Sequence, residues 1–204
     1  MTRTLISQAR TLAQTTGDPV IADSYSESNQ NTFFEVGDTS LKYGQSFTGD
    51  GGTLNSVKFY LKKFTLPTGN ATAEIYAHIG TYGISSKGTG LSLATSESLD
   101  VSTLTTSLQI ITFNFVGINK ISLTNGTYYV VVVSYSEGNG SNYIDIGADD
   151  SSPTHSGNST AYTGISWGTG SEDICFYVYK DGSVVNRTLA TGRTLASGRG
   201  LAGS

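Results

Sequence analysis

The sequence predicts an all-β protein, an antiparallel jelly-roll-like β-sandwich that carries extended N- and C-terminal arms. Short segments of alternating apolar and polar residues recur along the middle of the chain, separated by Gly, Asn and Asp turns. None of these segments has the three-to-four-residue apolar spacing of an amphipathic helix. Glycine supplies 25 of the 204 residues and only 14% are charged, a composition that favours strands and turns. Together these observations indicate a sandwich or jelly roll.

The length of 204 residues suits one large all-β domain. We expect an N-terminal arm over residues 1–17, the sandwich over 18–182 and a C-terminal repeat arm over 183–204. A helical pattern occurs in the N-terminal arm alone, where Leu5, Ala9 and Leu12 fall at i, i+4 and i+7.

The clearest strand pattern lies at 54–63, which places Val57, Phe59 and Leu61 on one face. The segment 71–79 alternates in the same way, and its inward residues are predicted to be Ala73, Ile75, Ala77 and Ile79. The segments 108–115 and 128–135 are apolar enough to be covered on both faces. Later strands are expected near Tyr143, near Trp167 and over 173–179.

Positive charge is concentrated in the two arms. All five arginines lie there, and residues 1–16 and 183–204 contain no Asp or Glu, so the arms carry +5. The segment between them sets seven lysines against sixteen carboxylates, a formal charge of −9. Opposite charges on separate parts of one chain favour attraction between copies, or between an arm and the body.

The C-terminal arm repeats every six residues, as RTLATG, RTLASG and RGLAGS, and Arg-Thr-Leu also occurs twice near the N-terminus. In an extended chain the Arg and Leu of each repeat share one side. Such a segment cannot bury its leucines alone, so we expect it to dock on another surface. A flexible tail remains the alternative. The predicted assembly residues are Arg3, Leu5, Arg10, Leu12, Arg187, Leu189, Arg193, Leu195, Arg199 and Leu201.

The body resembles a known family in its runs GQSFTGDGGTLNSVKFYLKK, PTGNATAEIYA, LTNGTYYVVVVSY and WGTGSEDICFYVYKDG. These runs, over roughly residues 40–182, are similar to bacterial and phage β-sandwich modules of the choice-of-anchor type. The resemblance implies a sandwich fold and carries no catalytic residues. It also implies a surface-anchored or virion-associated protein, and for this chain we expect a phage particle protein.

The segment Gly164–Gly168 matches the G-x-S-x-G pattern of a hydrolase nucleophile elbow, with Ser166 as the nucleophile. That motif requires a strand–turn–helix corner and a nearby His and acid. A further strand is expected after Ser166, and the chain has only His78 and His155. We therefore interpret the match as a strand bordered by glycines and predict no catalytic residues.

Three acidic residues, Asp145, Asp149 and Asp150, lie close together in a Gly- and Ser-rich segment. Calcium prefers several oxygen ligands, and loops of sandwiches often supply them. The spacing matches no known calcium loop, so solvated turn carboxylates are the favoured interpretation and calcium the alternative. We predict no cofactor, and the single cysteine, Cys175, cannot form an internal disulfide.

Aromatic side chains offer a second kind of site, because their faces stack on the apolar faces of sugars. Tyr143, Tyr162 and Trp167 are the main candidates for a glycan-binding surface, together with Tyr60 and Tyr76. Tyrosines are also ordinary strand residues, which is the competing explanation.

The leading hypothesis is a non-enzymatic structural protein whose arms lock it to other copies and to other virion proteins, as a capsid decoration or a tail or fibre component. The alternative is a carbohydrate-binding module for cell-surface glycans.

The arms lack aromatics and dense Lys/Arg, and the acidic body repels phosphate, so no nucleic-acid partner is expected. No apolar run reaches the roughly 20 residues of a membrane span. Since no secretory signal follows Met1, we expect assembly in a host cytoplasm, or an extracellular surface for an exported homologue.

Overall fold

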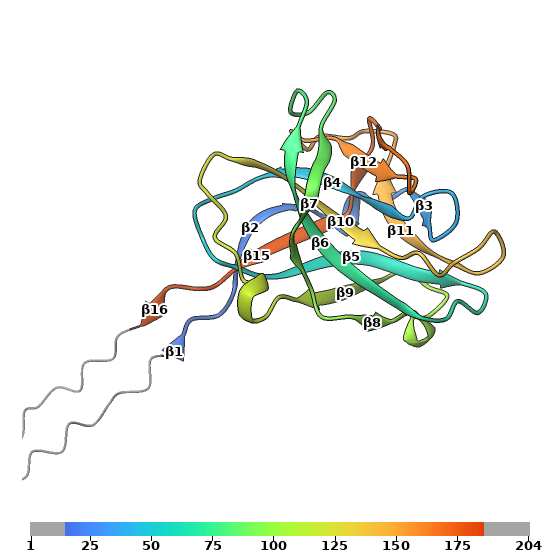
Figure 1. Cartoon of the computed structure of the whole chain (residues 1–204), viewed down its shortest axis with the longest axis horizontal. Coiled ribbons are helices and arrows are strands. Elements are labelled where there is room, and N and C mark those ends of the chain that lie inside the picture. Colours follow the sequence, from blue (N-terminus) through green and yellow to red (C-terminus); the bar gives the residue numbers. More distant parts are fainter. Residues whose placement is uncertain (1–14, 186–204) are drawn as a thin grey trace, which may run out of the picture.

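The computed structural model describes residues 15–185, which form two curled antiparallel sheets packed face to face (Figure 1). The predicted all-β sandwich is confirmed. The ten arm residues assigned to assembly lie outside the described residues, as does the helical pattern of the N-terminal arm. The helical elements of the described residues are three short 3-10 turns, η1 (Glu27–Asn29), η2 (Val101–Thr103) and η3 (Gly117–Asn119). No helix in this part of the chain is long and apolar enough to cross a membrane.

One sheet, here called the β10 sheet, has the order β13-β12-β4-β10-β6-β7, with β8 paired to β6. Its strands are β4 (Lys42–Thr48), β6 (Asn70–Ile79), β7 (Lys87–Thr95), β8 (Leu99–Asp100), β10 (Tyr128–Ser134), β12 (Ser159–Tyr162) and β13 (Trp167–Thr169).

The other, here called the β5 sheet, has the order β14-β11-β5-β15-β2, with β3 paired to β11 and β9 paired to β5. Its strands are β2 (Val20–Tyr25), β3 (Thr32–Val36), β5 (Leu54–Phe64), β9 (Gln109–Asn114), β11 (Tyr143–Asp149), β14 (Asp173–Ile174) and β15 (Phe176–Lys180).

The core lies between the two sheets. The alternation predicted for β5 is confirmed, because Val57, Phe59 and Leu61 are fully buried while the residues between them face outward. Phe47 of β4 and Phe176 of β15 pack into the same cluster. Burying side chains of this size stabilises the fold by about 1.5–3 kcal/mol each.

The prediction that 128–135 is covered on both faces is confirmed in β10. Val131 and Val133 face the core, while Val130 and Val132 form a second cluster on the outer face with Tyr76 and part-buried Trp167. The same prediction for 108–115 is wrong. Within the described residues β9 pairs with β5 alone, so it is an edge strand, and Ile110 is 36% exposed.

The inward placement of Ile79 is also wrong, since its side chain is 55% exposed. The register between β6 and β7 shifts between Ile75 and Ala77, and the alternation predicted for β6 does not persist beyond that irregularity. Tyr76, which the alternation placed outward, is nevertheless buried, because Trp167 covers it.

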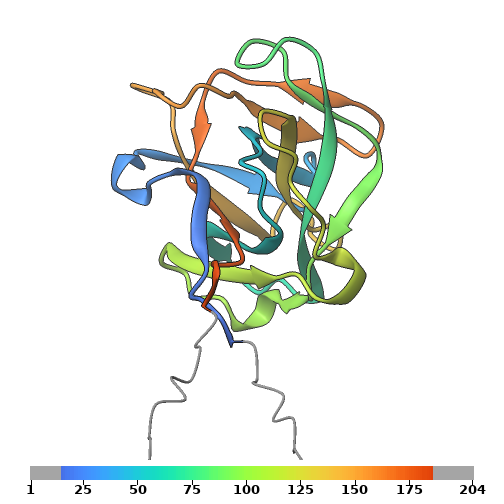
Figure 2. The same ribbon diagram turned by 90° about the vertical axis from the view of Figure 1, so that its left-hand side faces the viewer.

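Both ends of the described chain leave the domain together. β1 (Thr15–Thr16) pairs antiparallel with β16 (Val184–Val185), and the Gly17 amide donates to the Ser183 carbonyl at 3.2 Å. Figure 2 shows this two-stranded ribbon projecting from one end of the sandwich. Gly17 and Ser183, the residues at which the arm boundaries are predicted, lie directly beside these two strands.

Candidate functional site

The outer face of the β10 sheet carries an open hollow of about 260 Å³, lined by Lys42, Tyr76, Gly90, Tyr162 and Trp167. The sheet curls so that β13, at one edge, approaches β7, at the other. Residues from four strands and from the bulged part of β7 therefore meet in one place.

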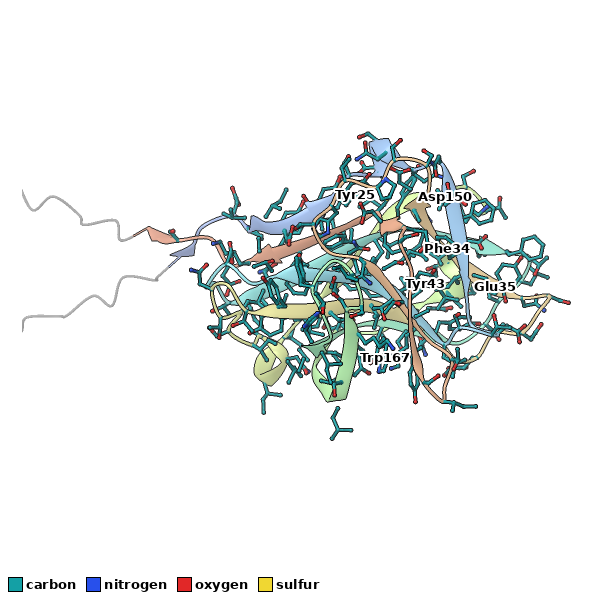
Figure 3. The ribbon with its side chains drawn as sticks, turned by 90° about the horizontal axis from the view of Figure 1, so that it is seen from above. Tyr25, Phe34, Glu35, Tyr43, Asp150 and Trp167 are labelled. Carbon is teal, nitrogen blue, oxygen red and sulfur yellow. The ribbon has the colours of Figure 1, made fainter. Side chains whose placement is uncertain are left out.

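The β12–β13 hairpin supplies the aromatic wall of the hollow. Tyr162 and Trp167 are cross-strand partners, with ring centroids 5.1 Å apart. The Trp167 ring also meets Tyr76 edge to face at 5.1 Å (Figure 3 labels Trp167). Gly88 permits this placement, because a Cβ there would lie 2.6 Å from the Trp167 ring. Trp167 thus covers the outer apolar cluster and leaves part of its ring facing the hollow.

Polar groups lie beside these rings. Lys42 Nζ is 2.6 Å from Glu74 Oε2, and the Tyr76 hydroxyl donates to the same oxygen. Burial, followed by the hydrogen bond to Glu74, raises the pKa of Tyr76. The hydroxyl therefore keeps its proton at neutral pH. An ammonium group, a carboxylate and aromatic faces together form an arrangement that suits a neutral polyhydroxylated ligand.

The structure brings together Tyr162, Trp167 and Tyr76 of the five aromatic candidates, but not Tyr143 or Tyr60. Tyr143 begins β11 in the other sheet and stacks on Phe64 at 4.6 Å. Lys42 and Glu74 were missed as site residues. The polar sequence KYGQSFT of β4 gave no strand signal, so nothing indicated that Lys42 lies next to Tyr162.

The G-x-S-x-G segment forms a hairpin turn between β12 and β13, so the interpretation as a strand bordered by glycines is wrong at Ser166, and the segment is not a strand–turn–helix corner either. The Thr163 amide donates to the Ser166 carbonyl at 3.1 Å, and β13 follows at once. Ile165 at the tip is 92% exposed. Within the described residues Ser166 therefore lacks the backbone corner that a nucleophile elbow requires.

His155 lies in a buried polar network that joins the two sheets. Its Nε2 is 3.2 Å from Asp23 Oδ1, while its Nδ1 accepts from the Gly157 amide at 3.0 Å. Because Nδ1 accepts, the assigned tautomer carries the proton on Nε2 and donates it to Asp23. Gln45 extends the network by donating to Asp173 Oδ1 at 2.8 Å. Burial opposes ionisation of Asp23, but the hydrogen bonds from His155 and Thr48 outweigh it and lower its pKa.

The three calcium candidates have different surroundings. Asp149 is buried and accepts hydrogen bonds from residues of three segments, Asp145 lies beside Lys62, and Asp150 is exposed. Among residues 15–185 no group of three or more His, Cys, Asp or Glu side chains could hold a metal ion. Cys175 is fully buried, and this burial raises the pKa of its thiol to about 12.

No protein-family model, curated protein or solved structure matches this chain.

Proposed function

We propose that this chain is a non-enzymatic assembly protein whose Arg-Thr-Leu arms lock copies to one another. The observation that supports this most directly is the pairing of β1 with β16. Because the two strands are joined, both basic arms start from one point of an otherwise acidic domain. Two arms that act from one point give a higher effective concentration at a neighbour than either arm alone.

The chemistry of the arms fits such a role. Each Arg-Thr-Leu unit offers one leucine, which contributes about 1.5–3 kcal/mol if it becomes fully buried. The arginine beside it can pair with a carboxylate through two parallel hydrogen bonds. Several weak contacts of this kind combine into a stable one.

The setting we propose is a phage particle, with the protein as a capsid decoration or as a tail or fibre component. The support is the resemblance of the body to virion-associated sandwich modules, together with arms that suit repeated subunit contacts. Its partners would be further copies of the same chain and other particle proteins.

Removal of residues 187–204 tests this proposal, because it removes the C-terminal repeats and leaves β16 in place. We expect the shortened protein to stay folded and to become monomeric by light scattering. The matched control keeps the composition of the C-terminal arm in scrambled order, which separates the pattern from the charge. A shortened protein that assembles like the full chain would contradict the proposal.

The aromatic hollow supports glycan binding as a second candidate function. The favouring observation is that Tyr162, Trp167 and Tyr76 converge beside the Lys42–Glu74 pair. A glycan array tests it with Tyr162→Ala, since this side chain is part-exposed and lies outside both core clusters. We expect at least tenfold weaker binding, while Tyr143→Ala on the other sheet serves as the control. An equal loss of glycan binding in both variants, or no glycan binding by the wild type, would exclude this hollow as a glycan-binding site.

A further inference from the structure

The strand β3 has an open edge at the end of the molecule opposite β1 and β16 (Figures 1 and 3). It pairs with β11 in register Phe33↔Gly147 and Glu35↔Asp145. Within residues 15–185 no strand pairs with its other edge. An open edge presents unpaired backbone groups, which an extended segment can join as an additional strand.

The side chains of β3 leave this edge unprotected. Phe34 faces inward and stacks on Tyr43 at 4.9 Å, while Phe33 faces outward and is 48% exposed. Lysine and proline, which commonly block the edges of sheets, are absent from Thr32–Val36.

Two other edge strands of the same sheet, β9 and β2, differ from β3 in charge. The edge strand β9 contains no acidic residue, and Asp23 of β2 is engaged by His155. On β3, by contrast, Glu35 lies directly opposite Asp145, and Asp38 follows in the next turn.

The carboxylates of Glu35, Asp38 and Asp145 have too few positive charges and hydrogen-bond donors around them. Glu35 Oε1 and Asp145 Oδ2 are buried without a hydrogen-bond partner among the described residues. Lys62 Nζ approaches Asp145 Oδ2 at 3.5 Å, but the same ammonium lies 3.5 Å from the Phe33 ring centroid. Burial, then repulsion from Asp38 and Asp145, raises the pKa of Glu35. A guanidinium group placed here would gain paired carboxylates and relieve that repulsion.

We propose that the β3 edge receives the C-terminal arm of a second copy as an added antiparallel strand. This inference rests on the proposed assembly function and names its acceptor surface. The outward residues of β3, Phe33 and Glu35, are two positions apart, as are Arg and Leu in every Arg-Thr-Leu unit. In antiparallel pairing, an arginine opposite Glu35 places its leucine opposite Phe33. The repeat therefore matches this edge in both charge and apolar spacing.

A second copy is the expected donor because β1 and β16, from which the arms continue, lie at the end of the domain opposite the β3 edge. A fully extended segment over 186–204 spans roughly 60 Å, which allows several repeats to lie along a neighbour. Contacts between unlike ends are heterologous, and they build a ring if the rotation closes or a filament if it does not.

Reversing the charge of Glu35 in the full-length chain tests whether the β3 edge accepts the arm. In Glu35→Lys the new ammonium faces Asp145, so we expect the fold to persist, as checked by thermal unfolding. We expect the protein concentration required for half-assembly, measured by light scattering at low ionic strength, to rise at least tenfold. Glu97→Lys makes the same charge change at an exposed residue after β7 and should assemble like the wild type.

The outcomes separate this inference from the proposed function. If Glu35→Lys assembles like the wild type while removal of 187–204 abolishes assembly, the arms act elsewhere and the β3 acceptor is wrong. If the wild type stays monomeric at every concentration, both proposals fail. Equal loss in the Glu35→Lys and Glu97→Lys variants would mean that net charge alone matters, which also overturns the assignment of the β3 edge.

Discussion

Asp145 and Asp149 lie four residues apart on β11, and both are almost fully buried, yet their surroundings are opposite. Asp149 accepts hydrogen bonds from Tyr25, Asn31, Ser151 and Ser152. The hydrogen bond from the Tyr25 hydroxyl is the largest influence and, against burial, lowers the pKa of Asp149 to about 2. Asp145 faces another carboxylate, and its burial, opposed by Lys62, raises its pKa.

These surroundings suggest different roles for the two buried carboxylates. Around Asp149 the chain supplies its own donors, and the carboxylate ties β2, the segment after η1 and the loop after β11 to β11. Around Asp145 and Glu35 the described residues supply one ammonium group, that of Lys62, for several carboxylates. Buried carboxylates without enough positive charge destabilise a folded protein. A basic segment from another copy would complete it.

The largest expected effect comes from removing the satisfied carboxylate. Asp149→Ala leaves the buried Tyr25 hydroxyl without its acceptor and removes the hydrogen bonds from Asn31, Ser151 and Ser152, so we expect a loss of about 3 kcal/mol in the free energy of unfolding. Urea denaturation measures this loss. The exposed neighbour serves as the control, since Asp150→Ala should change the free energy by less than about 0.5 kcal/mol. Similar losses in both variants would show that the buried Asp149 carboxylate contributes no more to stability than the exposed Asp150.

Acid titration gives a second measure of how much the ionised Asp149 carboxylate contributes to stability. The folded-state pKa of Asp149 is about 2, below its ordinary value of 3.8, so its contribution is present above pH 4 and is lost as pH falls towards 2. We expect the wild type to lose stability over this range and Asp149→Asn to lose less. Unfolding curves at several pH values check this expectation. An equally steep acid loss in the variant would contradict it.

The smallest change in stability is expected for a substitution on the β3 edge, and it is a gain where Asp149→Ala gives a loss. Because the folded-state pKa of Glu35 is raised, its ionised form destabilises the fold, and that cost is present above the ordinary pKa. We expect Glu35→Gln to gain up to about 1 kcal/mol at pH 7 under monomeric conditions and nothing at pH 3. Glu97→Gln is the control. A loss of stability at pH 7 would show that Glu35 is already satisfied.

Much of the fold follows from local patterns, whereas the sites depend on contacts between distant segments. The alternation of β5 and the apolar run of β10 predicted their burial. The strands β2, β3, β4 and β7 were missed, because they are short, rich in Ser, Thr and Gly, or interrupted by a bulge. Asp149 and Asp150 look alike in sequence, and only the fold brings the donors of Tyr25 and Asn31 to the carboxylate of Asp149. Tyr162 and Trp167 of the hollow are cross-strand partners in the β12–β13 hairpin, which lies within one short stretch of sequence. Lys42 lies beside Tyr162 because β4 pairs with β12 in register Lys42↔Tyr162, a contact between distant segments that the sequence did not indicate.

Disulfide trapping between two singly substituted chains detects the docking of the C-terminal arm on β3 of another copy. One chain carries Asp38→Cys and the other Ala190→Cys, the position that falls near residue 38 when Arg193 lies opposite Glu35. Native Cys175 is buried and should not compete. We expect oxidation of the mixture to form a 38–190 linked pair, several times more abundant than with Glu97→Cys in place of Asp38→Cys. Equal yields from the two mixtures would contradict docking of the arm on β3.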